Sequence, residues 1–140
     1  VFAPSPEERH PDHEHAARLL KEACFYAGLA NIKTEFHGKG QTAHRPKHLF
    51  YYLQHRLLAP DFIVDVSETF ERSRQGVLAF ASQFYQPNSN EPETFISRKN
   101  FLTGLESRAR FFGEQIGTTY GEAFIQEAAM GISNFSAAFR

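Results

Sequence analysis

Three histidines stand close together near the amino terminus, in the stretch Arg9-His10-Pro11-Asp12-His13-Glu14-His15. Pro11 and Asp12 favour a helix start, because proline's fixed φ suits the first turn and the aspartate carboxylate can accept a bond from a free N–H. His10 and His13 are three positions apart and can face one cavity, whereas His15 points elsewhere on a helix. Neutral imidazole is a preferred ligand of catalytic zinc. The pair therefore predicts either a metal-dependent hydrolytic site or, more simply, a solvated helix cap.

The elements around this stretch should place it at the edge of a sheet. Val1-Phe2-Ala3 predicts a strand, and apolar positions at helical spacing predict a helix over 13–27 with Gly28 as a left-handed residue after its last turn. A strand, a polar loop and a helix start bring side chains to the carboxyl edge of a parallel sheet, where open α/β folds bind ligands. Ligand chemistry is expected there.

The rest of the chain continues the alternation of strands and helices. Strands are expected over 47–54 and 62–66, a short strand or extended segment over 120–125, and a loop over 36–46. Ser67 is expected to cap a second helix, whose apolar stripe reaches Phe84. Ser97 is expected to cap a third helix that ends at Gly117. The pattern predicts an α/β fold.

Composition restricts the class of protein. With 140 residues, 41% of them hydrophobic and fifteen of them Phe, the chain fits one domain with a substantial core. A net charge of −1 gives no electrostatic reason to bind nucleic acid or an anionic membrane, so a small-molecule or protein partner is expected. No stretch approaches the roughly 20 apolar residues of a membrane span. The single Cys24 excludes an intrachain disulfide, is expected to be a buried thiol, and is compatible with a reducing cytoplasm.

Several stretches of the chain resemble those of a known enzyme family. Three stretches near the start resemble the second metal motif of the LmbE/PIG-L family of zinc-dependent N-deacetylases. They are Val1-Phe2-Ala3-Pro4, Arg9-His10-Pro11-Asp12-His13 and Ala16-Ala17-Arg18-Leu19. Later stretches resemble the branch that deacetylates N-acetylglucosaminyl-malate in bacillithiol biosynthesis. These stretches are Arg45-Pro46-Lys47, Tyr51-Tyr52-Leu53-Gln54, 60–65, 82–85 with Pro87-Asn88-Ser89, 91–94 and 120–124. The resemblance implies a partial Rossmann-like, three-layer α/β fold, with residues 1–140 as the carboxyl-terminal part of one deacetylase domain.

The resemblance also implies roles for the histidine stretch. His13 would be a zinc ligand, and His10 would stabilise the tetrahedral oxyanion and protonate the leaving amine. Asp12 would be the carboxylate that orients a histidine and raises its basicity.

Three further residues are expected to contact substrate. Arg9 suits the carboxylates of a malate group because its guanidinium is planar, although a surface arginine beside Glu7 and Glu8 is an equal alternative. Tyr120 and Glu122 would lie close to the active site; the alternative is a surface hydroxyl and a surface carboxylate. The expected substrate is an N-acetylglucosamine conjugate.

One family motif does not occur in these residues. The H-P-D-D sequence, which supplies two further metal ligands and the general base, is absent from the printed chain. One ligand cannot hold a catalytic zinc. We therefore expect the isolated chain to be inactive without the amino-terminal half or an equivalent chain. Deacetylases of this family are often oligomeric, so a homo-oligomer is one expectation, and the single cysteine makes a cytoplasmic location the expected one. Two alternatives stay open, namely a non-catalytic α/β interaction module and a deacetylase of another N-acetyl sugar.

Overall fold

The computed structural model describes residues 1–87 and 90–138 of the chain. Asn88 and Ser89, which form part of the family resemblance, lie outside the described residues, as do Phe139 and Arg140. The chain divides into two compact units. Among the described residues, the first unit comprises 1–62 and 124–138, and the second comprises 63–87 and 90–123.

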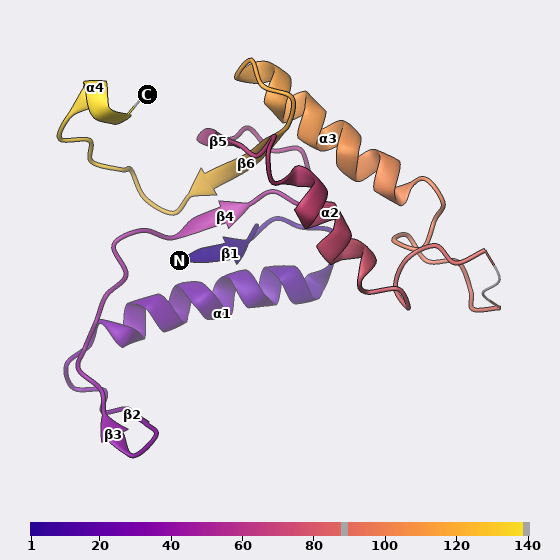
Figure 1. Cartoon of the computed structure of the whole chain (residues 1–140). Coiled ribbons are helices and arrows are strands. Elements are labelled where there is room, and N and C mark those ends of the chain that lie inside the picture. The colour runs from indigo at the N-terminus through magenta and orange to yellow at the C-terminus, as the bar shows by residue number, and fades with distance from the viewer. Residues whose placement is uncertain (88–89, 139–140) are drawn as a thin grey trace. The chain divides into compact units, whose positions relative to one another are not determined.

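The described residues form a mixed α/β structure, as the sequence pattern predicts (Figure 1). The elements are β1 (Phe2–Pro4), α1 (Pro11–Ala27), β2 (Glu35–Phe36), β3 (Lys39–Gly40), β4 (Phe50–Tyr52), β5 (Phe62–Asp65), α2 (Phe70–Leu78), α3 (Phe101–Gln115), β6 (Gly121–Gln126) and α4 (Phe135–Ala138). Four strands form a sheet in the order β1-β4-β6-β5, in which β1 runs parallel to β4 and β6 runs antiparallel to β4. None of the described helices is both long enough and apolar enough to cross a membrane.

The core of the first unit lies between α1 and the first strands. In the parallel register Ala3 pairs with Tyr51 and Pro4 with Tyr52. Ala3, Ala17 and Tyr51 are buried together, because the small side chains on β1 and α1 let the helix approach the strands closely. This packing holds the start of α1 near the carboxyl ends of β1 and β4.

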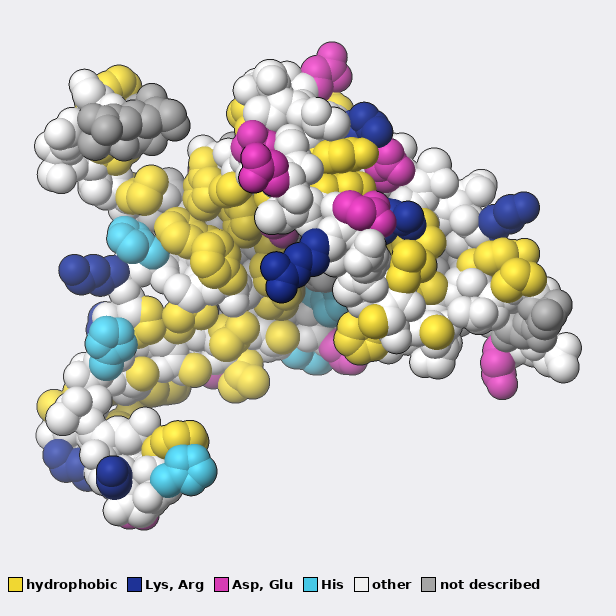
Figure 2. Space-filling model, viewed as in Figure 1, with side chains coloured by type: hydrophobic (Ala, Val, Ile, Leu, Met, Phe, Trp, Pro, Cys, Tyr) yellow, Lys and Arg dark blue, Asp and Glu magenta, His cyan; other side chains and the backbone are white. Residues whose placement is uncertain are grey.

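Aromatic side chains occupy the other side of these strands. Phe2 and Phe50 alternate with the buried Ala3 and Tyr51, so they point to the opposite face. Rings of Phe2, Phe50, Phe62 and Phe124 meet in pairs whose centroids are 5.2–5.6 Å apart. Phe2 nevertheless stays 61% exposed. Figure 2 shows hydrophobic side chains gathered on the surface over α1 and the neighbouring strands.

The second unit is built on a close approach of α3 to β6. A Cβ added to Gly113 would lie 2.8 Å from the carbonyl oxygen of Thr118, and one added to Gly121 would lie 2.7 Å from the nitrogen of Gly113. Both glycines are buried. Next to them the Phe70 ring stacks on Tyr120 with centroids 4.0 Å apart. Glycine at both positions is therefore what allows the helix and strand backbones to meet.

Two predicted helix starts are wrong. The second helix begins at Phe70 after Thr69, because the Ser67 hydroxyl accepts the backbone N–H of Tyr120 at 3.1 Å and donates to Asp65 at 2.6 Å. The third helix begins at Phe101, because the Ser97 hydroxyl instead accepts the backbone N–H of Thr94 at 2.8 Å. Both helices also end earlier than predicted. Helix α2 ends at Leu78 rather than reaching Phe84, and α3 ends at Gln115 rather than at Gly117.

Other local predictions need smaller corrections. Gly28 has a φ of −84° and so does not adopt the left-handed conformation. The segment 36–46 contains part of the β2–β3 hairpin, whose turn places His37 and Gly38 at positive φ. The strand expected over 47–54 is limited to Phe50–Tyr52, and Cys24 is half-buried rather than fully buried. The strands expected at β5 and β6 are confirmed.

Candidate active site

The histidine stretch forms the first turn of α1. His10 is the N-cap residue, and its Nδ1 accepts the backbone N–H of Asp12 at 3.2 Å. The expectation that the Asp12 carboxylate caps this helix is therefore wrong, because the imidazole takes that position. Since Nδ1 acts as the acceptor, the neutral His10 ring carries its proton on Nε2. His10 is thus set to donate a hydrogen bond through Nε2.

The structure brings His10 and His13 together. Their ring centroids are 5.6 Å apart, and the backbone N–H of His13 donates to the carbonyl of His10 at 3.0 Å. The His13 ring is half-buried, and its Nδ1 is fully buried without a hydrogen-bond partner in the described part of the chain. Leaving such an atom unsatisfied costs about 1–3 kcal/mol. A metal ion or a polar group from outside this chain would remove that cost.

The residues present fit one ligand of a metal site, but they do not form the whole site. A catalytic zinc commonly has three protein ligands. Residues 1–87 and 90–138 contain no group of three His, Cys, Asp or Glu side chains able to hold a metal. His13 offers one donor, so the other ligands of a zinc site would come from another polypeptide portion.

Asp12 and Arg9 flank the pair at the surface. The Asp12 Oδ2 lies 3.7 Å from His10 Nδ1, which is beyond hydrogen-bond distance, and the Asp12 side chain is 80% exposed. Asp12 therefore holds His10 through its backbone N–H. The Arg9 side chain is exposed, and its backbone N–H donates to Glu8 at 2.7 Å. Their predicted roles, orienting a histidine and binding substrate carboxylates, stay predictions.

Tyr120 and Glu122 belong to the second unit, and their contact with substrate stays a prediction. The Tyr120 hydroxyl accepts from Arg110 at 2.8 Å and donates to Glu106 at 3.2 Å. The Arg110 guanidinium also lies over the Tyr120 ring, 4.7 Å from its centroid. Glu122 lies on β6, where partial burial raises the pKa of its carboxyl although the side chain keeps contact with solvent.

Sequence reasoning missed Glu8, the residue that ties the histidine loop to the rest of the edge. Glu8 is only 3% exposed, and its carboxylate accepts the backbone N–H groups of Arg9 at 2.7 Å and of His55 at 2.9 Å. The sequence suggests an exposed acid beside Arg9. No local pattern marks its burial, because its partner His55 is 47 positions away and is brought near only by the pairing of β1 with β4.

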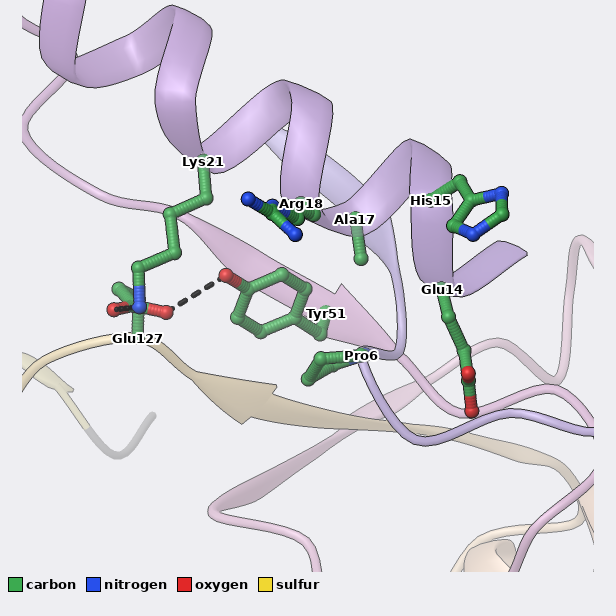
Figure 3. Close-up of a pocket in the computed structure, with 8 residues that line it drawn as sticks. All are labelled: Pro6, Glu14, His15, Ala17, Arg18, Lys21, Tyr51 and Glu127. Atoms are coloured by element: carbon green, nitrogen blue, oxygen red, sulfur yellow. Dashed lines mark hydrogen bonds and ion pairs between the residues drawn. The ribbon is translucent and has the colours of Figure 1, made fainter. Parts of the chain in front are cut away.

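A cavity of about 350 Å³ adjoins the histidine turn on the α1 side of the strands (Figure 3). The Tyr51 ring lies beneath the helix, and its hydroxyl donates to Glu127 at 2.7 Å. Lys21 reaches down from the helix to the other Glu127 oxygen. Burial and the bond to Glu127 raise the pKa of Tyr51, whereas the bond from Lys21 lowers the pKa of Glu127. The remaining lining residues are Pro6, Glu14, His15, Ala17 and Arg18.

Comparison with known sequences gives a curated relative. No family model matches the chain. The chain is 30% identical over 117 residues to a diacetylchitobiose deacetylase from Thermococcus kodakarensis. This match covers 84% of the chain but only 39% of the relative. The chain thus spans well under half the length of the curated relative that it matches.

Solved structures share the fold. The conserved protein TT1542 from Thermus thermophilus is 29% identical with a TM-score of 0.75, over 94% of this chain and 53% of that one. The N,N'-diacetylchitobiose deacetylase from Pyrococcus horikoshii is 25% identical with a TM-score of 0.66, over 99% and 50%. GalB, a hydratase from Pseudomonas putida, is 15% identical with a TM-score of 0.66, over 96% and 54%, and shows the fold alone. The chain is therefore homologous to diacetylchitobiose deacetylase and has the fold of about half of the solved one.

Proposed function

We propose that this chain is the carboxyl-terminal part of a zinc-dependent N-deacetylase domain that removes the acetyl group from an N-acetyl sugar. One observation carries the proposal. The unsatisfied Nδ1 of His13 lies beside His10 at the carboxyl edge of parallel strands, where α/β folds bind ligands. The homology to diacetylchitobiose deacetylase supports the reaction class.

In this proposal each histidine has a separate task. His13 would hold the zinc ion, which supplies Lewis acidity toward an amide carbonyl when bound. The Nε2–H of His10 would donate a hydrogen bond to the carbonyl oxygen as negative charge develops there, and His10 would keep this proton because its loss from a neutral ring would leave an imidazolate. The base that takes a proton from the attacking water would pass it to the amine as the C–N bond breaks. The N–H of Asp12 supports this hydrogen bond, because it occupies Nδ1 of His10 and leaves Nε2–H as the donor. The products are acetate and a free amino sugar.

The other parts of the site would come from outside these residues. Two further metal ligands and the base that removes a proton from water are assigned to an amino-terminal half, because the described residues contain no three-ligand group. The fraction of the relatives that the chain covers, 39% to 53%, supports this division. We expect the isolated chain to be inactive. A cytoplasmic homo-oligomer is part of the same proposal.

Two substrates are worth testing side by side. The stretches around Tyr51 and Tyr120 resemble the branch acting on N-acetylglucosaminyl-malate, whereas the matched enzymes are named for diacetylchitobiose. Arg9, Tyr120 and Glu122 are the residues that we assign to substrate binding. Specificity lies in loops and their side chains rather than in the fold, so the two sugars must be compared directly.

The test separates the two histidines in a chain paired with the amino-terminal half of a homologous deacetylase. His13→Ala should lose zinc and turnover together, whereas His10→Ala should keep zinc and lose about 100-fold or more in kcat. His15→Ala, two positions along the same helix, is the matched control and should change neither. Metal analysis and acetate release measure the outcome. Equal zinc content in the His13→Ala, His10→Ala and unmodified proteins would refute this division of tasks.

A further inference from the structure

Glu8 is one of two buried polar side chains in the described residues, the other being Ser5. One oxygen of Glu8 accepts the N–H of the next residue, Arg9, at 2.7 Å. The other oxygen accepts the N–H of His55 at 2.9 Å. A buried carboxylate is costly unless both oxygens are hydrogen-bonded, and here backbone groups from two separate loops meet that need.

The charge on Glu8 is retained in this environment. Burial raises the pKa of Glu8, but the N–H groups of Arg9 and His55 and the nearby His55 and His13 together hold it below its usual value. Bonds from backbone N–H groups to a charged acceptor are stronger than those between neutral groups. The link between the two loops is therefore a strong one at neutral pH.

The loop that carries Glu8 is also fastened to the helix that carries His13. The backbone N–H of Glu8 donates to the carboxylate of Glu14, in the first turn of α1, at 3.1 Å. Earlier in the same loop the Ser5 hydroxyl bonds both the N–H and the carbonyl of Glu7, at 3.2 Å and 3.0 Å. The loop from Ser5 to His10 is thus fixed by the Ser5 hydroxyl at its start, and by the bonds of Glu8 to His55 and to Glu14 of α1 at its middle.

Strand pairing explains why one carboxylate can join the two loops. Pro4 at the end of β1 pairs with Tyr52 at the end of β4, and the strands are parallel, so the chain leaves both strands at the same edge. Glu8 follows the first strand by four positions, and His55 follows the second by three. Glu8 bridges the two exits directly.

We propose that Glu8 is a positioning residue, which sets His10 and His13 at a defined place against the segment beginning at His55 and makes His55 part of the same site. The assignment rests on the proposed function. Both oxygens of Glu8 are occupied by backbone groups, so it acts through the histidines rather than on substrate. Loss of the link would displace the pair, and misplacement of reacting groups by about 1 Å can cost on the order of 100-fold in rate.

The experiment compares Glu8→Gln with Glu7→Gln, an exposed neighbour, in the full chain paired with the amino-terminal half. An amide offers only one acceptor and would turn its NH2 group toward a backbone N–H. We expect Glu8→Gln to lower kcat by about 10-fold or more with KM changed less than about 3-fold, and Glu7→Gln to change neither. If Glu8→Gln does not fold, Glu8→Asp keeps the charge but shortens the reach to His55, and the same kinetic split is expected.

A second measurement keeps this inference separate from the proposed function. In 15N NMR spectra of the chain alone, Glu8→Gln should shift the backbone amide of His55 and the ring nitrogens of His13, and Glu7→Gln should not. If the unmodified paired protein releases no acetate, the proposed function fails, and these spectra still decide whether Glu8 positions the histidines. Spectra of Glu8→Gln that match those of Glu7→Gln would overturn the inference. Unchanged kcat in a folded Glu8→Gln protein would overturn it as well.

Discussion

Glu127 shows how one carboxylate organises the cavity beside the histidine turn. It accepts the hydroxyl of the buried Tyr51 on one oxygen and pairs with Lys21 of α1 on the other. Tyr51 is 3% exposed and needs an acceptor, since a buried hydroxyl without one is costly. The pair with Lys21 is partly exposed and is expected to contribute less.

Replacing Glu127 by Ala should therefore destabilise the protein by about 1–2 kcal/mol, mainly because the Tyr51 hydroxyl loses its acceptor. Lys21→Ala is the matched variant and should cost about 1 kcal/mol or less. Urea unfolding of the three proteins measures both values. A Lys21→Ala effect larger than that of Glu127→Ala would contradict this ranking.

Because Glu127 is hydrogen-bonded in the folded protein, we expect the free energy of unfolding to depend on pH. The bond from Lys21 and the bond from Tyr51 lower the pKa of Glu127 below its ordinary value of 4.5. The stabilisation is fully present above that ordinary pKa and is lost as the pH falls through the lower folded-state pKa. Acid titration of stability should therefore show a smaller loss in Glu127→Gln than in the unmodified chain. Equal losses in both proteins would show that Glu127 does not contribute to acid sensitivity.

Single residues also show where sequence reasoning stops. The spacing of His10 and His13 predicted that both side chains can face one cavity, and the structure brings their ring centroids to 5.6 Å from each other. The burial of Glu8 and the use of Ser67 to hold Tyr120 could not be predicted, because each depends on a backbone N–H 47 or 53 positions away. A local pattern contains no information about such partners.

At the scale of elements, the contact between α3 and β6 depends on two glycines. Gly113→Ala would place a Cβ 2.8 Å from backbone atoms of Thr118 and Tyr120, which cannot move without shifting the strand. We expect a loss of about 1–3 kcal/mol or more. Gly104→Ala is the control on the same helix, since its Cβ would meet nothing within 4 Å, and it should stabilise the helix by about 0.5–1 kcal/mol. Thermal unfolding of both variants gives the comparison, and equal effects would contradict the close contact.

The elements that could be predicted are those whose apolar residues recur at regular spacing or form a short continuous run. The helix over 13–27 was found as α1 because its apolar positions recur regularly, and β5 and β6 were found from short apolar runs. Helix starts at Ser67 and Ser97 were misplaced because a serine hydroxyl can bond a distant strand or a local turn as readily as a helix end. The ends of α2 and α3 were placed too late, because apolar residues continue past the last helical turn.

At the scale of the whole molecule, the chain has the fold of about half of each solved relative. It contributes two adjacent histidines, one with an unsatisfied buried nitrogen, and no complete metal site within the described residues. We therefore propose that catalysis requires a second polypeptide portion. The idea that the site is divided between this chain and an amino-terminal half came from the family resemblance. Composition and residue spacing alone favoured only an α/β fold with a histidine pair.

The most direct test is acetate release by the chain mixed with the amino-terminal half of a homologous deacetylase, using diacetylchitobiose and N-acetylglucosaminyl-malate. We expect that neither part alone releases acetate and that the mixture does. A chelator should abolish the activity, and added zinc should restore it. A mixture that forms a stable complex by gel filtration, yet releases no acetate from either sugar with zinc in excess, would contradict the central claim.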